Sequence, residues 1–189
     1  MSQSIQQVYA DGFRAVPAYG LVYDPIVKGY DTNFWATIAG TPAVASNKLR
    51  LNADTIASLA QFRYGRLKMA INVPVAPTSS QDKRFGFYNP GTDSGIFFDI
   101  TDAVFTVQVV LKGSSLYLET GTWAGHTTEQ VFEIEWHKEG VVFLRAGNVV
   151  GSFAFDDGVD EALGIYSSNA NADNMDVGYY HVSRVGNIG

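Results

Sequence analysis

The chain has 189 residues, of which 46% are hydrophobic, 13% aromatic and 17% charged, enough for one good-sized domain built mainly of strands and tight turns. Its net charge of -6 argues against nucleic-acid and anionic-membrane partners, because phosphate groups repel an acidic surface. Cysteine is absent, which excludes disulfides, a thiolate nucleophile and a cysteine-ligated zinc site.

The first 30 residues mix Tyr, Phe, Gly and Pro without regular alternation. We expect residues 1–30 to form an arm that packs on the following domain, 31–189, or docks on a neighbouring subunit. The opening "MSQSIQQVYADGF" lacks the basic and apolar regions of a secretory signal. No apolar run approaches the roughly 20 residues of a membrane span. These features predict a protein made in a cytoplasm.

Apolar residues alternate with polar ones along most of the remaining chain, which is typical of strands with one buried face. Glycine-, asparagine- and aspartate-rich turns separate these runs at the spacing of a sandwich. The stretch "NADTIASLAQF" fits a strand or a short helical turn. The pattern predicts an all-β fold, a two-sheet antiparallel sandwich, with strands in the segments 66–73, 94–101, 104–112, 115–120, 131–137 and 138–153.

Two clusters rich in Asp and Asn, within 156–162 and 169–176, have two interpretations. Asn and Asp are common turn formers, and their oxygen atoms are also the ligands that calcium prefers. The histidines His126, His137 and His181 lack the spacing of a zinc site. We therefore expect no cofactor and no metal site, with calcium as the alternative at the Asp/Asn clusters.

Aromatic residues in two glycine-containing segments are candidates for stacking on sugar rings. Trp123 lies in "TGTWAGHTTE", and Tyr88 precedes a turn in "FGFYNPG". An aromatic ring at such a position either stacks on a ligand or caps the edge of the core. The sequence does not distinguish between these two interpretations.

Three titratable residues, Glu133, Glu135 and His137, alternate along one strand and therefore share a face. Two carboxylates and an imidazole in a row could form a displaced acid/base pair or a site for a hard cation. The competing interpretation is a solvated face or one neutralised by ion pairs.

Three segments, "FEIEWHKEGVVFLRAGNVVGSF", "LGIYSSNANADNMDVGYYHV" and "YGRLKMAINVPV" with "FGFYNPG", resemble the concanavalin A-like lectin/glucanase superfamily over roughly residues 33–185. The chain looks closest to laminarinase-like modules of tailed-phage virion structural proteins. The resemblance implies a jelly roll whose concave sheet forms a groove that often holds sugar.

In the family-sixteen glycoside hydrolases of that superfamily, one groove strand carries a Glu-x-Asp-x-(x)-Glu motif. A retaining glycosidase needs two carboxyl groups about 5–5.5 Å apart, one as nucleophile and one as acid/base. The matching strand here is "SGIFFDIT". Phe97 and Thr101 stand where the glutamates would be, and Asp99 matches the intervening aspartate. The resemblance therefore predicts no catalytic residues on this strand.

From these observations we expect the chain not to be an enzyme but a structural or adhesion module on the surface of a phage particle. The arm would contact other virion subunits in an oligomer or assembly, and the groove would bind glycans. The alternatives are a glycoside hydrolase with a displaced carboxylate pair and a free lectin. The candidate glycan-binding residues are Phe97, Asp99, Tyr88, Trp123, Glu133, Glu135 and His137.

Overall fold

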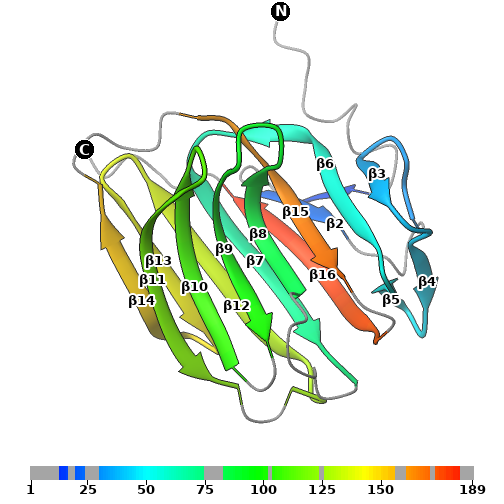
Figure 1. The fold of residues 1–189 in the computed structure, drawn as a ribbon. Helices are drawn as coiled ribbons and strands as arrows, with labels where there is room; N and C mark the ends of the chain where they lie inside the picture. The colour runs from blue at the N-terminus through cyan, green and yellow to red at the C-terminus, as the bar shows by residue number, and fades with distance from the viewer. Residues whose placement is uncertain are drawn as a thin grey trace, which may run out of the picture.

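A computed structural model gives the fold of the chain (Figure 1). It describes residues 13–16, 20–23, 30–74, 83–101, 104–123, 126–155, 161–170 and 173–183, with the backbone alone for the first two ranges. Within these residues every regular element is a β-strand.

Sixteen strands follow one another along the described chain. They are β1 (Phe13–Val16), β2 (Gly20–Tyr23), β3 (Trp35–Ala39), β4 (Ala43–Ala45), β5 (Lys48–Leu51), β6 (Thr55–Phe62), β7 (Gly65–Asn72), β8 (Lys83–Asn89), β9 (Ser94–Thr101), β10 (Val104–Leu111), β11 (Ser114–Thr122), β12 (Gln130–His137), β13 (Gly140–Arg145), β14 (Asn148–Ala154), β15 (Leu163–Asn169) and β16 (Met175–Ser183). The segment that also fitted a helical turn is strand β6.

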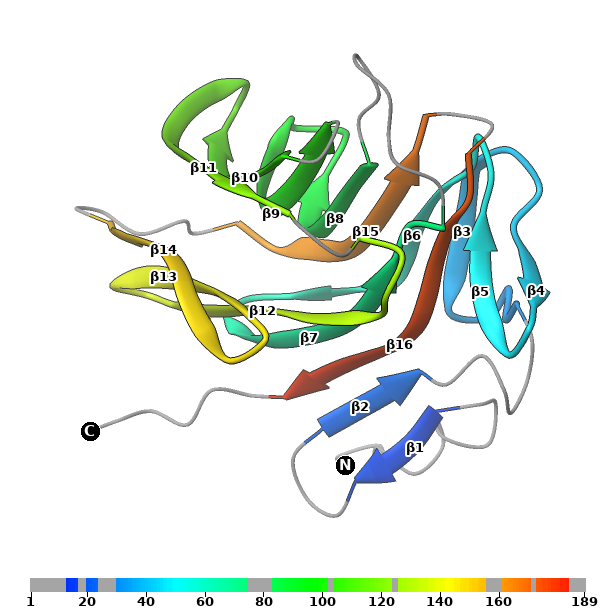
Figure 2. The same ribbon diagram turned by 90° about the horizontal axis from the view of Figure 1, so that it is seen from below.

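The strands form two antiparallel sheets that pack face to face (Figure 2). The seven-stranded sheet has the order β11-β10-β9-β8-β15-β6-β3. The nine-stranded sheet has the order β1-β2-β16-β7-β12-β13-β14, and β5 pairs with both β16 and β4. The predicted all-β, two-sheet antiparallel jelly-roll sandwich is therefore confirmed.

Aromatic side chains from both sheets meet in the core. Phe98 of the seven-stranded sheet packs edge-on against Phe132 and Phe143 of the nine-stranded sheet, with ring centroids 5.0 and 5.4 Å apart. Phe87 contacts Trp136 across the same interface at 5.5 Å. Each fully buried side chain of this size stabilises the fold by about 1.5–3 kcal/mol. This aromatic layer fixes the two sheets relative to each other.

Two hydrogen bonds within the interior also connect the layers. The Tyr180 hydroxyl on β16 donates to the Ser167 hydroxyl on β15 at 2.8 Å. The Asn169 amide on β15 donates to the Leu51 carbonyl on β5 at 2.7 Å. Because a buried polar group is costly without a partner, these bonds favour one alignment of the sheets.

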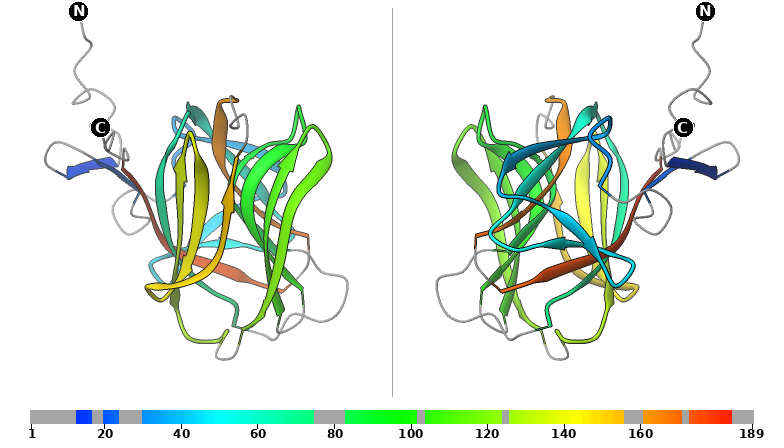
Figure 3. Two further views of the ribbon diagram at one scale, coloured as in Figure 1. Left: turned by 90° about the vertical axis from the view of Figure 1, so that its left-hand side faces the viewer. Right: turned by 90° about the vertical axis from the view of Figure 1, so that its right-hand side faces the viewer.

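Part of the predicted arm forms a β-hairpin at the edge of the nine-stranded sheet. Strand β2 pairs with β16, with Tyr23 opposite Tyr180 and Gly20 opposite Ser183. Figure 3 shows this hairpin extending from one side of the sandwich. Its role in docking on a neighbour, and the domain boundary at residue 30, stay predictions.

Candidate functional site

The outer face of the seven-stranded sheet, the face turned away from the core, presents three rows of side chains across adjacent strands. The middle row runs from Gln108 on β10 through Phe97 on β9 and Gly86 on β8 to Tyr166 on β15. The flanking rows are Thr106-Asp99-Arg84-Ser168 and Val110-Gly95-Tyr88-Gly164. Phe85, Phe87, Ile96, Phe98 and Ile100, which alternate with these residues, fill the core. The period-two pattern of β8 and β9 thus sets this face.

Two glycines allow the aromatic residues of this face to lie close to the backbone. Gly86 is opposite Phe97, and Gly95 is opposite Tyr88. A Cβ atom on Gly86 would lie 2.6 Å from the Ile96 carbonyl oxygen, and one on Gly95 would lie 2.5 Å from the Tyr88 ring. Gly86 also has a φ of 152°. The two rings consequently pack edge-on, with centroids 5.5 Å apart.

Arg84 covers the centre of this face. Its guanidinium carbon lies 4.2 Å from the centroid of the Phe97 ring, within cation–π range. Its Nη2 donates to Asp99 Oδ2 at 2.9 Å. Phe97 is only 1% exposed and Asp99 6% exposed. A ligand that approaches this face would therefore contact Arg84 before it contacts Phe97 or Asp99.

Hydroxyl and carboxylate groups gather at the end of this face near the β8–β9 turn. The Tyr88 hydroxyl donates to Asp93 Oδ1 at 2.5 Å. Asn89 and Thr92 both donate to Glu161, which precedes β15. Burial, followed by the hydrogen bond to Asp93, raises the pKa of Tyr88 to about 12. The phenol thus remains a proton donor over the physiological pH range.

Trp123 does not reach this face. It is fully buried, and its ring packs edge-on against Phe132 with centroids 5.4 Å apart. Two hydrogen bonds connect the neighbouring His126 to the backbone of Val73. The His126 Nδ1 bonds to the Val73 carbonyl oxygen, and the Val73 amide donates to the His126 carbonyl oxygen. The structure therefore supports the interpretation in which the Trp123 ring caps the core.

Glu133, Glu135 and His137 lie on the other side of the sandwich. Their strand, β12, belongs to the nine-stranded sheet, and the residues that alternate with them, Ile134 and Trp136, fill the core. The three side chains therefore occupy the outer face of that sheet. The sandwich core separates them from Asp99, so the structure does not bring these carboxylates into one site.

Basic side chains neutralise the two glutamates. Arg66 lies 2.5 Å from a Glu133 oxygen and 3.2 Å from a Glu135 oxygen, and Lys68 lies 3.2 Å from Glu133. Burial alone would raise the pKa of Glu133, but the hydrogen bonds from Arg66 and Lys68 outweigh it and hold this pKa below its ordinary value. This arrangement matches the ion-paired interpretation of the sequence pattern.

Among the residues placed by the structure, no three acidic or histidine side chains are grouped closely enough to hold a metal ion. Parts of both Asp/Asn clusters, residues 156–160 and 171–172, lie outside the described residues. Calcium at those clusters stays a prediction. In the described part of the chain, no helix is long and apolar enough to cross a membrane.

No protein-family model and no curated relative matches the sequence. Solved structures match the fold closely. A Crh5 transglycosylase in complex with NAG has a TM-score of 0.75 at 12% identity, covering 88% of this chain and 84% of its own. A lichenase from a mouse hindgut metagenome has a TM-score of 0.72 at 9% identity, covering 88% and 99%. The family GH16 endo-β-1,3(4)-glucanase SCLam has a TM-score of 0.67 at 13% identity, covering 92% and 95%.

The fold is the concanavalin A-like jelly roll. At identities of 9–14% these structures establish the shared fold. None of the three proteins named above is a phage structural protein. The jelly-roll fold that the resemblance implied is therefore confirmed. The closer relation to virion proteins stays a prediction.

The prediction that the chain is not an enzyme is contradicted by these structures. Glucanases and transglycosylases share the jelly roll over most of its length. The prediction rested in part on Phe97 and Thr101, which stand in place of the two glutamates on β9. Other carboxylates, Asp93 and Glu161, are bonded to residues of the same face, so the lack of two glutamates on β9 does not remove acidic groups from it.

Sequence reasoning missed Arg84 and Tyr166, two principal residues of this face. Arg84 alternates with Phe85 and Phe87 in "KRFGFYN", which would have placed it beside Tyr88 on the outer face. Tyr166 alternates with the buried Ile165 and Ser167 of β15. Neither residue forms a motif, and their proximity to β9 depends on strand order.

Proposed function

We propose that this chain is a carbohydrate-active protein that holds a polysaccharide segment across the outer face of the seven-stranded sheet. The observation that carries the proposal is the composition of that face at β8, β9 and β15. Aromatic and hydroxyl side chains surround the ion pair between Arg84 and Asp99, whose charges neutralise each other. Ligand sites commonly combine apolar surface with a few placed polar groups.

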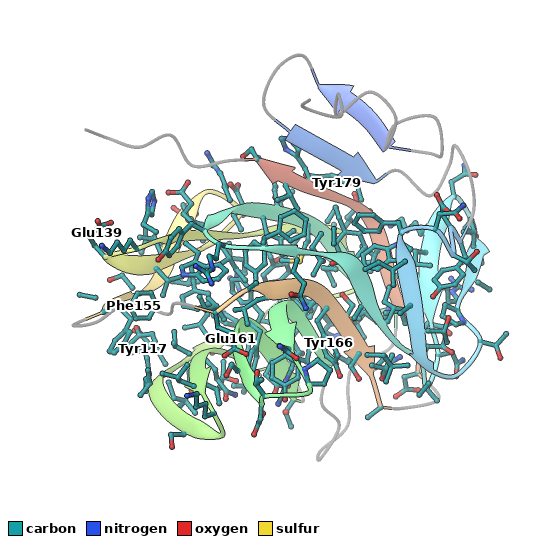
Figure 4. The ribbon with its side chains drawn as sticks, turned by 90° about the horizontal axis from the view of Figure 1, so that it is seen from above. Tyr117, Glu139, Phe155, Glu161, Tyr166 and Tyr179 are labelled. Carbon is teal, nitrogen blue, oxygen red and sulfur yellow. The ribbon has the colours of Figure 1, made fainter. Side chains whose placement is uncertain are left out.

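The rim of this face offers the contacts that a sugar chain requires. Tyr166 is half-buried and packs against Tyr88, with ring centroids 4.9 Å apart. Gln108 lies beside Phe97 and Thr106 lies beside Asp99 on the adjacent strand β10, and both are half-buried. Rings of this kind can stack on the apolar faces of pyranoses, and the amide and hydroxyl groups can bond to sugar hydroxyls. Figure 4 places Tyr166 and Glu161 on this side of the sandwich.

The reaction class that we propose is cleavage or transfer at a glycosidic bond, as in the glucanases and the transglycosylase that share the fold. Among the described residues, Asp99, Asp93 and Glu161 are carboxylates available to such chemistry on this side. Phe97 and Thr101 supply none, so the acid/base arrangement would differ from two glutamates on β9. Positioned acids and bases contribute roughly 100- to 10,000-fold to such reactions.

The test is to incubate the protein with β-1,3- and mixed-linkage β-1,3-1,4-glucans and to measure new reducing ends and transfer to a labelled acceptor oligosaccharide. We expect turnover that falls by about 100-fold or more in Asp99→Asn or Glu161→Gln. Glu135→Gln, on the opposite face, is the matched control and should retain activity. Binding without any turnover, in the wild-type chain and with every glucan, would refute the reaction while leaving the binding proposal intact.

The location on a phage particle also remains a proposal. It is tested by deleting residues 1–30 and measuring incorporation into particles. Incorporation at the wild-type level would refute the docking role of the arm.

A further inference from the structure

Strand β11 forms a free edge of the seven-stranded sheet. Among the described strands it pairs only with β10. In the left panel of Figure 3 this side of the sandwich faces the viewer. Its nine residues include no Lys, Arg or Pro, the residues with which proteins commonly protect an edge. A row of unpaired backbone groups on such a strand is a template for pairing with another strand.

Two other edges with described side chains carry features that limit pairing. Strand β3 has five residues, and its register with β6 shifts between Thr37 and Ala39. At the edge of the nine-stranded sheet, the Ser152 amide of β14 donates to the Tyr117 hydroxyl at 3.3 Å. Strand β11 has one irregularity, a shift opposite Val109 and Val110, which leaves Tyr117–Thr122 in regular pairing.

Two apolar side chains of β11 are exposed. Leu118 is 57% exposed and Leu116 43% exposed, and Val104 on the neighbouring strand is 38% exposed. Leu118 lies opposite Gln108 and therefore on the outer face of the sheet. Removing such side chains from water contributes roughly 25 cal/mol for each Å² of apolar surface. Association through this edge would bury them.

The sequence of β11 is complementary to itself in one antiparallel register. In a two-fold pairing centred on Leu118, this residue faces its own copy. In this register Glu119, the only charged residue of the strand, faces Tyr117 of the second copy. Within one chain the Tyr117 hydroxyl already donates to Glu119. A pairing centred on Glu119 would instead oppose two carboxylates, which is unfavourable.

From this edge we propose that a second copy of the chain pairs antiparallel with β11 about a two-fold axis at Leu118, joining two seven-stranded sheets into one continuous sheet. The pairing places the two outer faces side by side on the same side of the joined sheet. This inference does not depend on the function proposed above.

The oligomeric state tests the proposal first. Analytical ultracentrifugation over a range of concentrations should show a dimer of the wild-type chain. Leu118→Lys should weaken dimerisation by about tenfold or more, because it replaces an apolar pair with two like charges. Leu59→Lys is the matched control, since Leu59 is 59% exposed on β6 of the same sheet. A wild-type chain that stays monomeric, or equal effects of the two lysines, would overturn the proposal.

Cross-linking tests the register. The chain lacks cysteine, so a single introduced thiol reports only on its own position. Under mild oxidation Leu118→Cys should form a disulfide-linked dimer, because directly opposite residues have Cβ atoms about 4.5–5.5 Å apart. Thr120→Cys and Leu59→Cys should remain largely monomeric. Preferential cross-linking through Thr120→Cys would refute the axis at Leu118, and equal cross-linking of all three would refute the pairing.

Discussion

Arg84 and Asp99 form an ion pair on the outer face of the seven-stranded sheet, with Arg84 Nη2 2.9 Å from Asp99 Oδ2. The two residues are opposite each other on β8 and β9, so the pairing follows from the strand register. The same guanidinium lies over the Phe97 ring. The pair therefore neutralises the centre of the face and fixes the side chain that a ligand would meet there.

Replacing one partner of this pair should destabilise the fold. We expect Arg84→Met and Asp99→Asn each to lower the free energy of unfolding by about 2–3 kcal/mol, because each leaves a largely buried charge or dipole without its ionic partner. The double variant should lose less than the sum of the two. Urea unfolding of all four proteins measures this coupling, and strictly additive losses would show that the pair contributes nothing.

Adding a methyl group at Gly86 should also be destabilising. The new Cβ would meet the backbone of β9, and the φ of 152° disfavours residues other than glycine. We expect Gly86→Ala to cost about 3 kcal/mol or more. Gly91→Ala, where the Cβ would meet only the Asn89 side chain at 3.2 Å, is the control and should cost about 1 kcal/mol or less. Thermal denaturation that ranks the two variants equally would contradict this account.

Glu133 should make stability depend on acid pH. Because its pKa in the folded state lies below the ordinary value, the charged form stabilises the fold above the unfolded pKa, and this contribution is lost as the pH falls through the folded pKa. In Glu133→Gln this loss should be absent, so the stability curve should be flatter than that of wild type below the ordinary Glu133 pKa of 4.5. The exposed Glu139, on the turn before β13, gives the control variant Glu139→Gln. Parallel curves for wild type and Glu133→Gln would refute the assignment.

Tyr88 should have the opposite dependence at alkaline pH. Its pKa of about 12 in the folded state exceeds the ordinary value of 10.0, so the folded chain retains a proton that the unfolded chain releases. Its contribution to stability is complete below pH 10 and is lost as the pH rises toward 12. Tyr88→Phe should reduce the alkaline decline in the free energy of unfolding. A decline identical to that of wild type would assign it to other groups.

The sandwich could be predicted from the sequence because alternation along strands such as β7, β9 and β12 directly reports which residues face the core. The same alternation correctly separated Phe97 and Asp99 from Ile96 and Phe98. What it could not give is which strands are neighbours. Arg84 reaches Asp99 only because β8 pairs with β9, a long-range relation that local periodicity does not contain.

The predicted glycan-binding set mixed residues from three environments for the same reason. Asp99, Trp123 and Glu133 lie on one outer face, in the core and on the opposite outer face, respectively. A tryptophan in a glycine-containing segment gives the same sequence signal whether it caps the core or faces a ligand. Exposure also depends on neighbours, since Phe97 faces outward and is nevertheless covered by Arg84.

We propose above that the polysaccharide lies on the outer face of the seven-stranded sheet. Isothermal titration with β-1,3-1,4-glucan oligosaccharides, using wild type, Tyr166→Ala and Tyr179→Ala, tests it most directly. Both tyrosines are half-buried, and they lie on opposite sides of the sandwich (Figure 4). We predict that Tyr166→Ala weakens binding by about tenfold or more while Tyr179→Ala binds as wild type does. Binding that is unchanged in Tyr166→Ala and lost in Tyr179→Ala would contradict the account.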